Sequence, residues 1–137
     1  MADILPMQEA TALGLHAAVL LAARDRPTPM TDMAARLSAS EAHLSKVLQT
    51  LVHAQILTSK RGPRGGYSLM REANAITLLD VYRAFEGDIR KDGCLFSRKV
   101  CSRASCTLGS LVASVRAQVH DYLRNTTLEE AAKEQGR

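Results

Sequence analysis

The chain has 137 residues, of which 46% are hydrophobic and 23% are charged. These proportions are typical of a globular protein and exclude a largely disordered one, and the length favours a single domain with a short helical extension. A membrane span needs roughly 18 apolar residues, but Arg24 ends the densest apolar run, residues 17–23. Residues 1–10 have acids and no basic residue, which is not the pattern of a secretory signal peptide.

Lysine and arginine together number 18 and aspartate and glutamate 14, which gives a formal net charge of +4. This excess is compatible with a polyanionic partner but does not require one. The 3 cysteines are an odd number without a secretory signal, so a disulfide scaffold is disfavoured. We therefore expect a cytoplasmic protein with no membrane partner.

The first half of the chain predicts two short helices after a longer one. Residues 10–23 are apolar on nearly all sides, which is typical of a helix buried in a core or between subunits. Thr31 is expected to cap a helix over residues 31–37, because a threonine oxygen can accept an unpaired backbone N–H there. The serines of residues 38–40 interrupt the chain, and either can cap the next helix, with Glu41 near its first turn.

The next helix has two contrasting faces. Its apolar residues recur with the helical period and form one stripe, Leu44, Val47, Leu48, Leu51 and Val52. The opposite face lacks the mixture of acids and bases found on a merely solvated helix, and it carries Ala42, Lys46, Gln49 and His53, flanked by His43, Ser45 and Thr50. Such an uncharged-to-positive face suits the major groove of DNA.

Two short strands, residues 56–60 and 67–70, are predicted on either side of a turn rich in glycine and proline. The segment 60–71 contains 4 basic residues and no acid. A glycine-rich tip lets the backbone approach a phosphate, while Arg61 and Arg64 can reach a phosphate or a narrow minor groove. Two helices followed by this hairpin predict a winged helix-turn-helix.

The second half of the chain contains a further short helix, an irregular loop and a long helix. Thr77 is expected to cap a helix over residues 78–86, which Gly87 ends. A long helix over about 107–124 has the alternating spacing of a coiled-coil seam, at Leu108, Val112, Val115, Val119 and Tyr122. Because the sequence contains no second long helix, we expect the same helix of another copy to be its partner. The tail, residues 127–137, is expected to form a short polar helix that frays.

We therefore predict a mainly α fold with three parts: a winged helix-turn-helix DNA-binding domain with a small two-stranded wing over residues 1–87, a cysteine-bearing sensor loop over 88–106, and a dimerisation helix with its tail over 107–137. The alternative is a small helical domain whose basic residues are simply solvated.

An enzyme is not indicated, because no Ser/His/Asp or paired-carboxylate pattern stands out and the glycine-rich turn lacks the ending of a phosphate-binding loop.

Residues 40–48, 61–67 and 76–81 resemble the Rrf2 family of bacterial transcription regulators, and the similarity covers about residues 8–128. The resemblance implies a homodimer that binds a palindromic operator on double-stranded DNA through a recognition helix and a wing. The residues that we expect to contact DNA are Ser40, His43, Ser45, Lys46, Gln49, Lys60, Arg61, Arg64 and Tyr67.

The cysteines are spaced as Cys94-x6-Cys101-x4-Cys106. Thiolates are the preferred ligands of iron–sulfur clusters, whereas structural zinc sites usually contain more closely spaced cysteine pairs. Family members that bind clusters also have three cysteines in this loop, with about five residues in each gap. We therefore expect an iron–sulfur cluster, either 2Fe–2S or 4Fe–4S, that controls operator binding by a repressor.

The sequence departs from the family at the fourth ligand. IscR-like members have a histidine where this chain has Gly109, and NsrR-like members use an aspartate of the other subunit where it has Ala12. Glu9 of the other subunit is our candidate. Three alternatives stay open: a thiol-based redox switch, a metabolite-gated regulator that forms a complex with a biosynthetic enzyme, and an iron–sulfur carrier with a vestigial wing.

Overall fold

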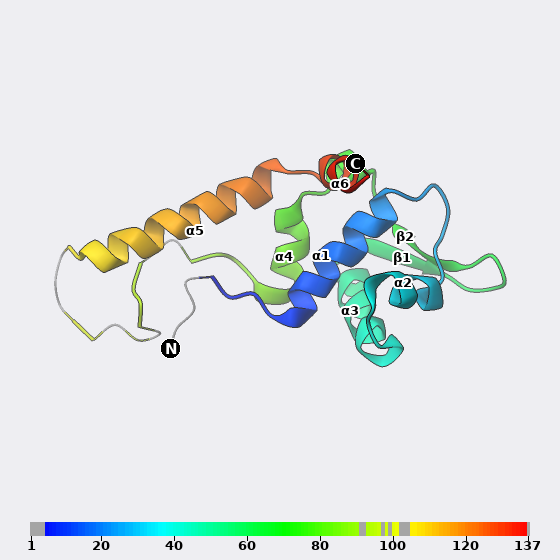
Figure 1. Ribbon diagram of the computed structural model, residues 1–137, viewed down its shortest axis with the longest axis horizontal. Coiled ribbons are helices and arrows are strands. Elements are labelled where there is room, and N and C mark those ends of the chain that lie inside the picture. Colours follow the sequence, from blue (N-terminus) through cyan, green and yellow to red (C-terminus); the bar gives the residue numbers. More distant parts are fainter. Residues whose placement is uncertain (1–4, 91–92, 97, 99, 102–104, 137) are drawn as a thin grey trace.

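The computed structural model describes residues 5–90, 93–96, 98, 100–101 and 105–136. These residues form six α-helices, one 3-10 turn and one two-stranded sheet, in the order α1 (Glu9–Ala22), α2 (Met30–Leu37), α3 (Glu41–His53), β1 (Leu57–Lys60), β2 (Gly66–Leu69), η1 (Ala73–Ala75), α4 (Leu78–Glu86), α5 (Thr107–Asn125) and α6 (Leu128–Gln135). This order confirms the predicted mainly α winged helix-turn-helix fold. Helix α5 extends to one side of the body (Figure 1). No helix among the described residues is long and apolar enough to cross a membrane.

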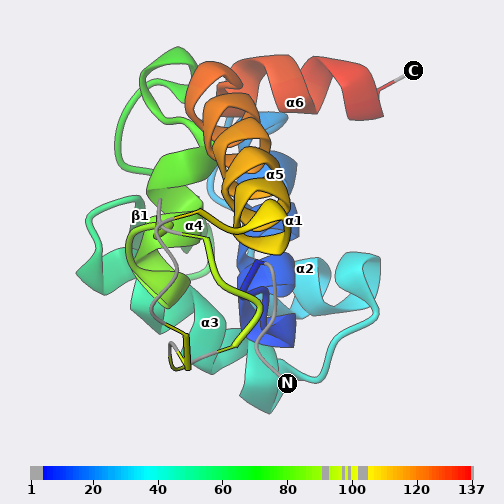
Figure 2. The same cartoon turned by 90° about the vertical axis from the view of Figure 1, so that its left-hand side faces the viewer.

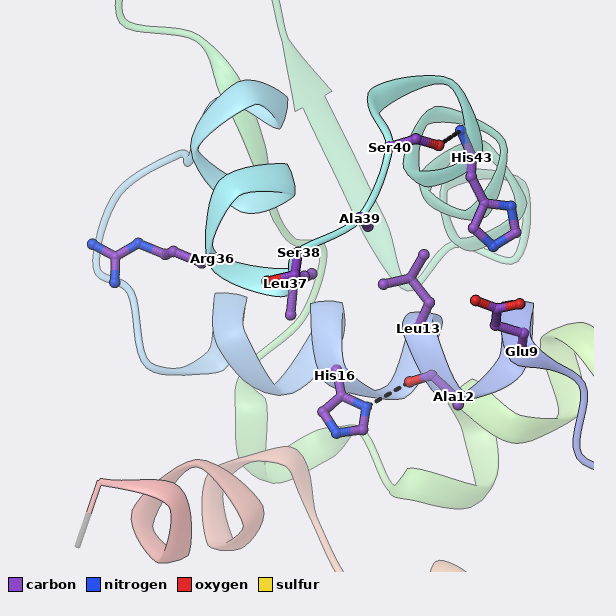
Figure 3. A pocket seen from close by; sticks show the side chains of 10 residues that line it. All are labelled: Glu9, Ala12, Leu13, His16, Arg36, Leu37, Ser38, Ala39, Ser40 and His43. Atoms are coloured by element: carbon purple, nitrogen blue, oxygen red, sulfur yellow. Dashed lines mark hydrogen bonds between the residues drawn. The ribbon is translucent and has the colours of Figure 1, made fainter.

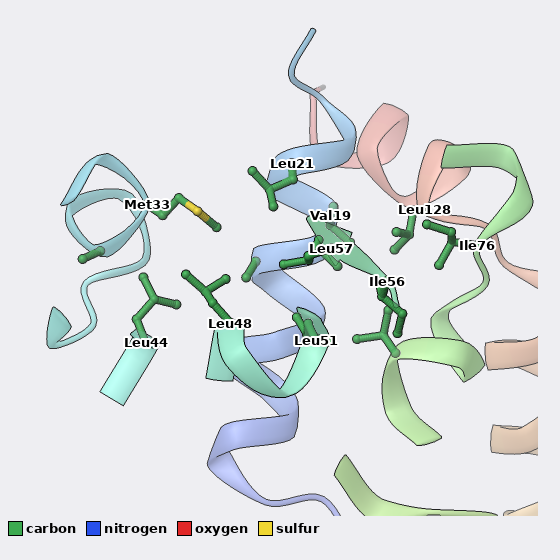
Figure 4. Packing of buried hydrophobic residues seen from close by; sticks show 14 residues of the cluster. Val19, Leu21, Met33, Leu44, Leu48, Leu51, Ile56, Leu57, Ile76 and Leu128 are labelled. Carbon is green, nitrogen blue, oxygen red and sulfur yellow. The ribbon is translucent and has the colours of Figure 1, made fainter. Parts of the chain in front are cut away.

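Helix α1 lies at the centre of the body, in contact with α2, α3, α4, α6 and β2. Its apolar character on nearly all sides follows from this position, because most of its sides face another element, whereas Glu9 and His16 are exposed. The main core gathers large side chains from most of the elements (Figure 4), among them Leu21, Met33, Leu44, Leu48, Leu51, Ile56, Leu57, Ile76 and Leu128. Burial of each such side chain contributes about 1.5–3 kcal/mol relative to its exposure.

The helix-turn-helix consists of α2, a short turn and α3. Helix α2 begins at Met30 with Pro29 as its N-cap, so the predicted cap at Thr31 is wrong and that residue lies inside the helix. Proline fixes φ near the helical value and has no N–H to satisfy, which suits the start of a helix. Ser38 ends α2 in the left-handed conformation. Ser40 caps α3, its hydroxyl accepting a backbone N–H from the first turn at 3.2 Å.

The wing is an antiparallel hairpin whose register runs from Leu57 opposite Leu69 to Lys60 opposite Gly66. It is attached to the segment before α2, because Thr28 and Tyr67 each donate a backbone N–H to the other's carbonyl at 2.9 Å. Gly66 is required at this junction. It has φ +144°, and a Cβ atom at this position would overlap the carbonyl group of Thr28. The side chain of Tyr67 is half-buried against the main core.

The chain returns to the body in α6, which packs on α1. Thr127 and Glu130 form a capping box at its start, and Thr127 pairs with Thr77 in an isolated bridge. Leu128 is 0% exposed and belongs to the main core. The short polar helix expected in the tail is present, but the expectation that it frays is wrong, since one large apolar side chain anchors it. Because Leu128 belongs to it, the main core extends beyond residue 87, where the sequence predicted the end of the DNA-binding domain.

Helices α4 and α5 lie side by side (Figure 2). A second, smaller core holds them together and contains Leu79, Tyr82, Ile89 and Leu123, with Val119 packed against it. The Tyr82 hydroxyl donates to the carbonyl of Pro6 at 2.6 Å. Burial raises the pKa of Tyr82, and the carboxylate of Glu86 raises it further, whereas the charge of Arg116 lowers it. This core fixes the C-terminal half of α5 to the body.

We expect Gly66→Ala to lower the free energy of unfolding by about 1–3 kcal/mol, because alanine at a positive φ is strained and its Cβ would displace the wing from Thr28. Chemical denaturation measures this change. Gly136→Ala is the matched control, since Gly136 has φ −79° and a Cβ atom added there would lie 3.7 Å from its nearest neighbours. Equal stability of the two variants would show that this junction does not hold the wing.

Candidate functional site

Helix α3 presents a polar face to the outside of the molecule. Its apolar stripe is directed inward, with Leu44, Val47, Leu48 and Leu51 buried. Lys46 and Gln49 are exposed, whereas Ser45 is half-buried and Ser40 caps the helix. The helical period therefore located the inward and outward faces correctly. The outward face offers an ammonium group and an amide, which are groups that can bind base edges in the major groove.

His43 is placed differently from its neighbours in the predicted DNA-contacting set. The residue is half-buried, and its Nε2 atom is buried without a hydrogen-bond partner among the described residues. Figure 3 shows the ring directed toward Glu9 on α1 rather than outward. A contact between His43 and DNA would therefore require a different rotamer. The helical period gives the angle of a side chain around its own helix, but not whether another helix covers it.

A cavity of about 590 Å³ lies between α1 and the helix-turn-helix (Figure 3). Glu9, Leu13 and His16 line it from α1, and the imidazole Nδ1 of His16 donates to the carbonyl of Ala12 at 2.7 Å. None of the residues that line the cavity is a cysteine. No cysteine lies beside Glu9 in this cavity, so Glu9 could act as a ligand only to a cluster held by the cysteines of the other subunit.

The wing tip exposes three basic side chains, Lys60, Arg61 and Arg64. Its turn is closed by a hydrogen bond from the N–H of Gly65 to the carbonyl of Gly62 at 2.9 Å. A Cβ atom at Gly65 would overlap the backbone of Lys60, so this turn needs glycine there. The wing and α3 lie at the same end of the molecule, away from the N-terminus of α5 (Figure 1).

The segment that bears Cys94 is in close contact with the first turn of α5. A Cβ atom at Gly109 would lie 2.6 Å from the carbonyl oxygen of Gly93, so the two backbones touch where both residues are glycine. Cys106 is the N-cap of α5, and its Sγ accepts the N–H of Gly109 at 3.4 Å. Cys94 and Cys106 thus lie next to this contact in the sequence, and of the three cysteines Cys94 is half-buried whereas Cys101 and Cys106 are exposed.

The residue types of this loop suit an iron–sulfur cluster, because three free thiols are available on one stretch of chain. In the part of the chain that the structure describes, no three side chains of histidine, cysteine, aspartate or glutamate are grouped closely enough to hold a metal ion. Binding of a cluster would therefore require the three cysteines to come closer together.

Helix α5 has one apolar face that its own chain covers and one that is exposed, and the predicted seam contains residues of both. Val112 is 0% exposed and Val119 packs on the second core, so both are covered by their own chain. Leu111, which the predicted seam omitted, is 54% exposed. The outward residues, which we name the α5 stripe, are Leu108, Leu111, Val115 and Tyr122, of which only Val115 is half-buried. The spacing alone could not separate the face that meets α4 from the face that meets solvent.

The chain matches the model of a protein family described as "Rrf2: Iron-dependent Transcriptional regulator" over residues 7–134. It is similar to the putative HTH-type transcriptional regulator BadM of Rhodopseudomonas palustris, with 42% identity over 81 residues. That match covers 58% of this chain and 52% of BadM, so it spans about half of the length of that relative. The transcriptional regulator IscR of Vibrio campbellii is 28% identical over 116 residues, covering 85% of this chain and 69% of IscR.

Among solved structures, the chain is similar to CymR, the global cysteine regulator of B. subtilis. The two share 30% sequence identity and superpose with a TM-score of 0.81. The superposition covers 95% of this chain and 98% of CymR. These relatives are transcriptional regulators and not enzymes.

Proposed function

Because the chain belongs to the Rrf2 family of transcriptional regulators, we propose that it is a cytoplasmic, homodimeric repressor that binds a palindromic operator on double-stranded DNA. The observation that carries the proposal is the joint exposure of Lys46 and Gln49 on α3 and of Arg61 and Arg64 on the wing. The first pair suits base edges, and the arginines suit phosphates or a narrow minor groove.

The α5 stripe is the surface that we assign to dimerisation. Contiguous exposed apolar side chains on a helix mark an interaction surface. A second copy offers the same stripe, and a two-fold axis brings the two together without leaving either exposed. Each recognition helix of the dimer would then meet one half-site, about 34 Å from the other along the DNA.

Cys94, Cys101 and Cys106 are the proposed thiolate ligands of an iron–sulfur cluster, with Glu9 of the other subunit as an oxygen donor at the fourth position. Such a cluster would supply sensitivity to oxygen or nitric oxide. The link to DNA binding is mechanical. Cys106 caps the helix that carries the α5 stripe, so a change at its sulfur alters the first turn of that helix. A small rotation of α5 changes the distance between the two recognition helices.

A thiol switch is the second candidate, and the exposed Sγ of Cys106 at the start of α5 favours it. Formation of an S–S bond with Cys94 would release two protons and two electrons to hydrogen peroxide, giving two molecules of water. This bond would tie the segment that bears Cys94 to the first turn of α5. The same helix would then respond without any metal.

We expect Arg64→Ala to weaken binding to all DNA sequences alike. It should also reduce, by about one, the slope of the logarithm of the binding constant against the logarithm of the salt concentration. Gln49→Ala should instead cost about 1–3 kcal/mol on a duplex selected for tight binding, and little on random DNA. Fluorescence anisotropy at several salt concentrations measures both. Lys133→Ala on α6 is the control and should change neither. An unaltered salt slope in Arg64→Ala would contradict the role given to the wing.

Leu111→Asp should convert the dimer into monomers, because an unpaired carboxylate would be buried twice in the interface at a cost of several kcal/mol. Leu111 is 54% exposed in the protomer, so we expect circular dichroism to show an unchanged fold. Light scattering gives the mass. Ser114→Asp, an exposed residue outside the α5 stripe, should leave the dimer intact. A soluble Leu111→Asp dimer would rule out the stripe as the interface.

Cys101→Ala should abolish the cluster, because two thiolates would be left to hold all of the iron. Iron and acid-labile sulfide per protomer, in protein prepared without oxygen, measure the loss, and Ser105→Ala serves as the control. Near-zero iron in both wild type and Cys101→Ala after reconstitution would contradict the cluster. In that case hydrogen peroxide should change the DNA affinity of the wild type but not of Cys106→Ala.

A further inference from the structure

A groove between α5 and the segment after α4 is not used by any of the functions above. Its first part is a cavity of about 430 Å³, lined by Ile89, Arg90, Ala113, Arg116, Ala117, His120, Asp121 and Arg124. A second hollow of about 570 Å³ adjoins it and shares His120 and Arg124. Cavities of this size hold small ligands. We refer to the first part as the α5 groove.

The α5 groove is rich in positive charge. Among the described residues, three arginines and the carboxylate of Asp121 line it, and that carboxylate contacts the imidazole Nδ1 of His120 at 3.4 Å. Arg116, His120 and Arg124 are each four residues apart, so they form one row along α5. Arg90 approaches from the other wall.

The floor of the groove is apolar. Ile89 is buried, and Ala113 and Ala117 contribute only methyl groups. These small side chains leave room beside the helix, and guanidinium groups beside an apolar surface bind anions more strongly than they do in open solvent.

The groove lies on the flank of α5 opposite the α5 stripe. Tyr122 of the stripe and Ala113 of the groove are nine residues apart, which is about two and a half helical turns. A second copy seated on the stripe would therefore leave the groove open. None of the residues that line the groove belongs to α3 or the wing.

We propose that the α5 groove binds a small metabolite with two or more phosphate or carboxylate groups. Guanidinium groups match both of these anions with paired hydrogen bonds. A row of arginines selects for more than one anionic group on the ligand, and the alanine floor accepts a short carbon skeleton. The ligand would bridge Arg90, at the start of the cysteine loop, to Arg116 and Arg124 on α5. The site goes beyond the proposed function and does not depend on the state of the cysteines.

Isothermal titration with sodium pyrophosphate and with citrate, each at fixed ionic strength set by sodium chloride, tests the proposal on the full chain. We expect one anion per protomer and a loss of affinity of about tenfold or more in Arg124→Gln. Arg124 is exposed, so its replacement should leave the unfolding transition in chloride unchanged. Binding of pyrophosphate alone would assign the site to phosphates, and binding of citrate alone to carboxylates.

Two controls distinguish the groove from other basic surfaces. Arg26→Gln removes an exposed arginine that pairs only with the neighbouring Asp25 among the described residues, and Arg64→Ala removes one from the wing. Both should bind the anions as the wild type does. Equal affinity of wild type and Arg124→Gln, or a loss confined to Arg64→Ala, would overturn the proposal, since the anions would then bind elsewhere. Neither result depends on whether the protein binds DNA.

Discussion

The burial of α1 on most of its sides is the constraint on which the rest of the structure depends. This helix has no continuous polar face, so most of its surface must be covered, and α2, α3, α4, α6 and β2 pack against it. Gly14 allows one of these contacts to be close, because a Cβ atom at this position would overlap the ring of Phe85 on α4. The recognition helix and the helix that leads to the cysteine loop are thus both fixed to one central element.

Helix α5 extends this arrangement outward, and each of its flanks has a different neighbour. The flank with Val112 and Leu123 is buried in its own chain, the α5 stripe is exposed, and the row of Arg116, His120 and Arg124 lies on the flank opposite the stripe. Its first turn contacts Gly93 of the cysteine loop. In the proposed dimer this helix would connect the loop, the second copy and the body, so chemistry at a sulfur atom would change the spacing of the two recognition helices.

The sequence predicted those features that depend on neighbours along the chain. The stripe of α3, the cap at Thr77 and the glycine-rich wing turn are local patterns, and the structure has all of them. It did not predict which distant element covers a given side chain. Leu128 anchors a helix of polar composition, and the ring of His43 turns toward α1, because tertiary neighbours rather than periodicity determine burial.

The size of the effect that one sulfur atom can exert follows from its place as a helix cap. Sulfur is a weaker acceptor than a hydroxyl oxygen, so the Cys106 cap stabilises the first turn of α5 by at most about 1 kcal/mol. A two-fold dimer contains two such caps, and about 2 kcal/mol corresponds to a shift of roughly thirtyfold between two conformations. That shift is enough for regulation when the two conformations are nearly balanced. The contact of Gly93 with Gly109 would contribute to the balance between these two conformations, because it joins the cysteine loop to the turn that Cys106 caps.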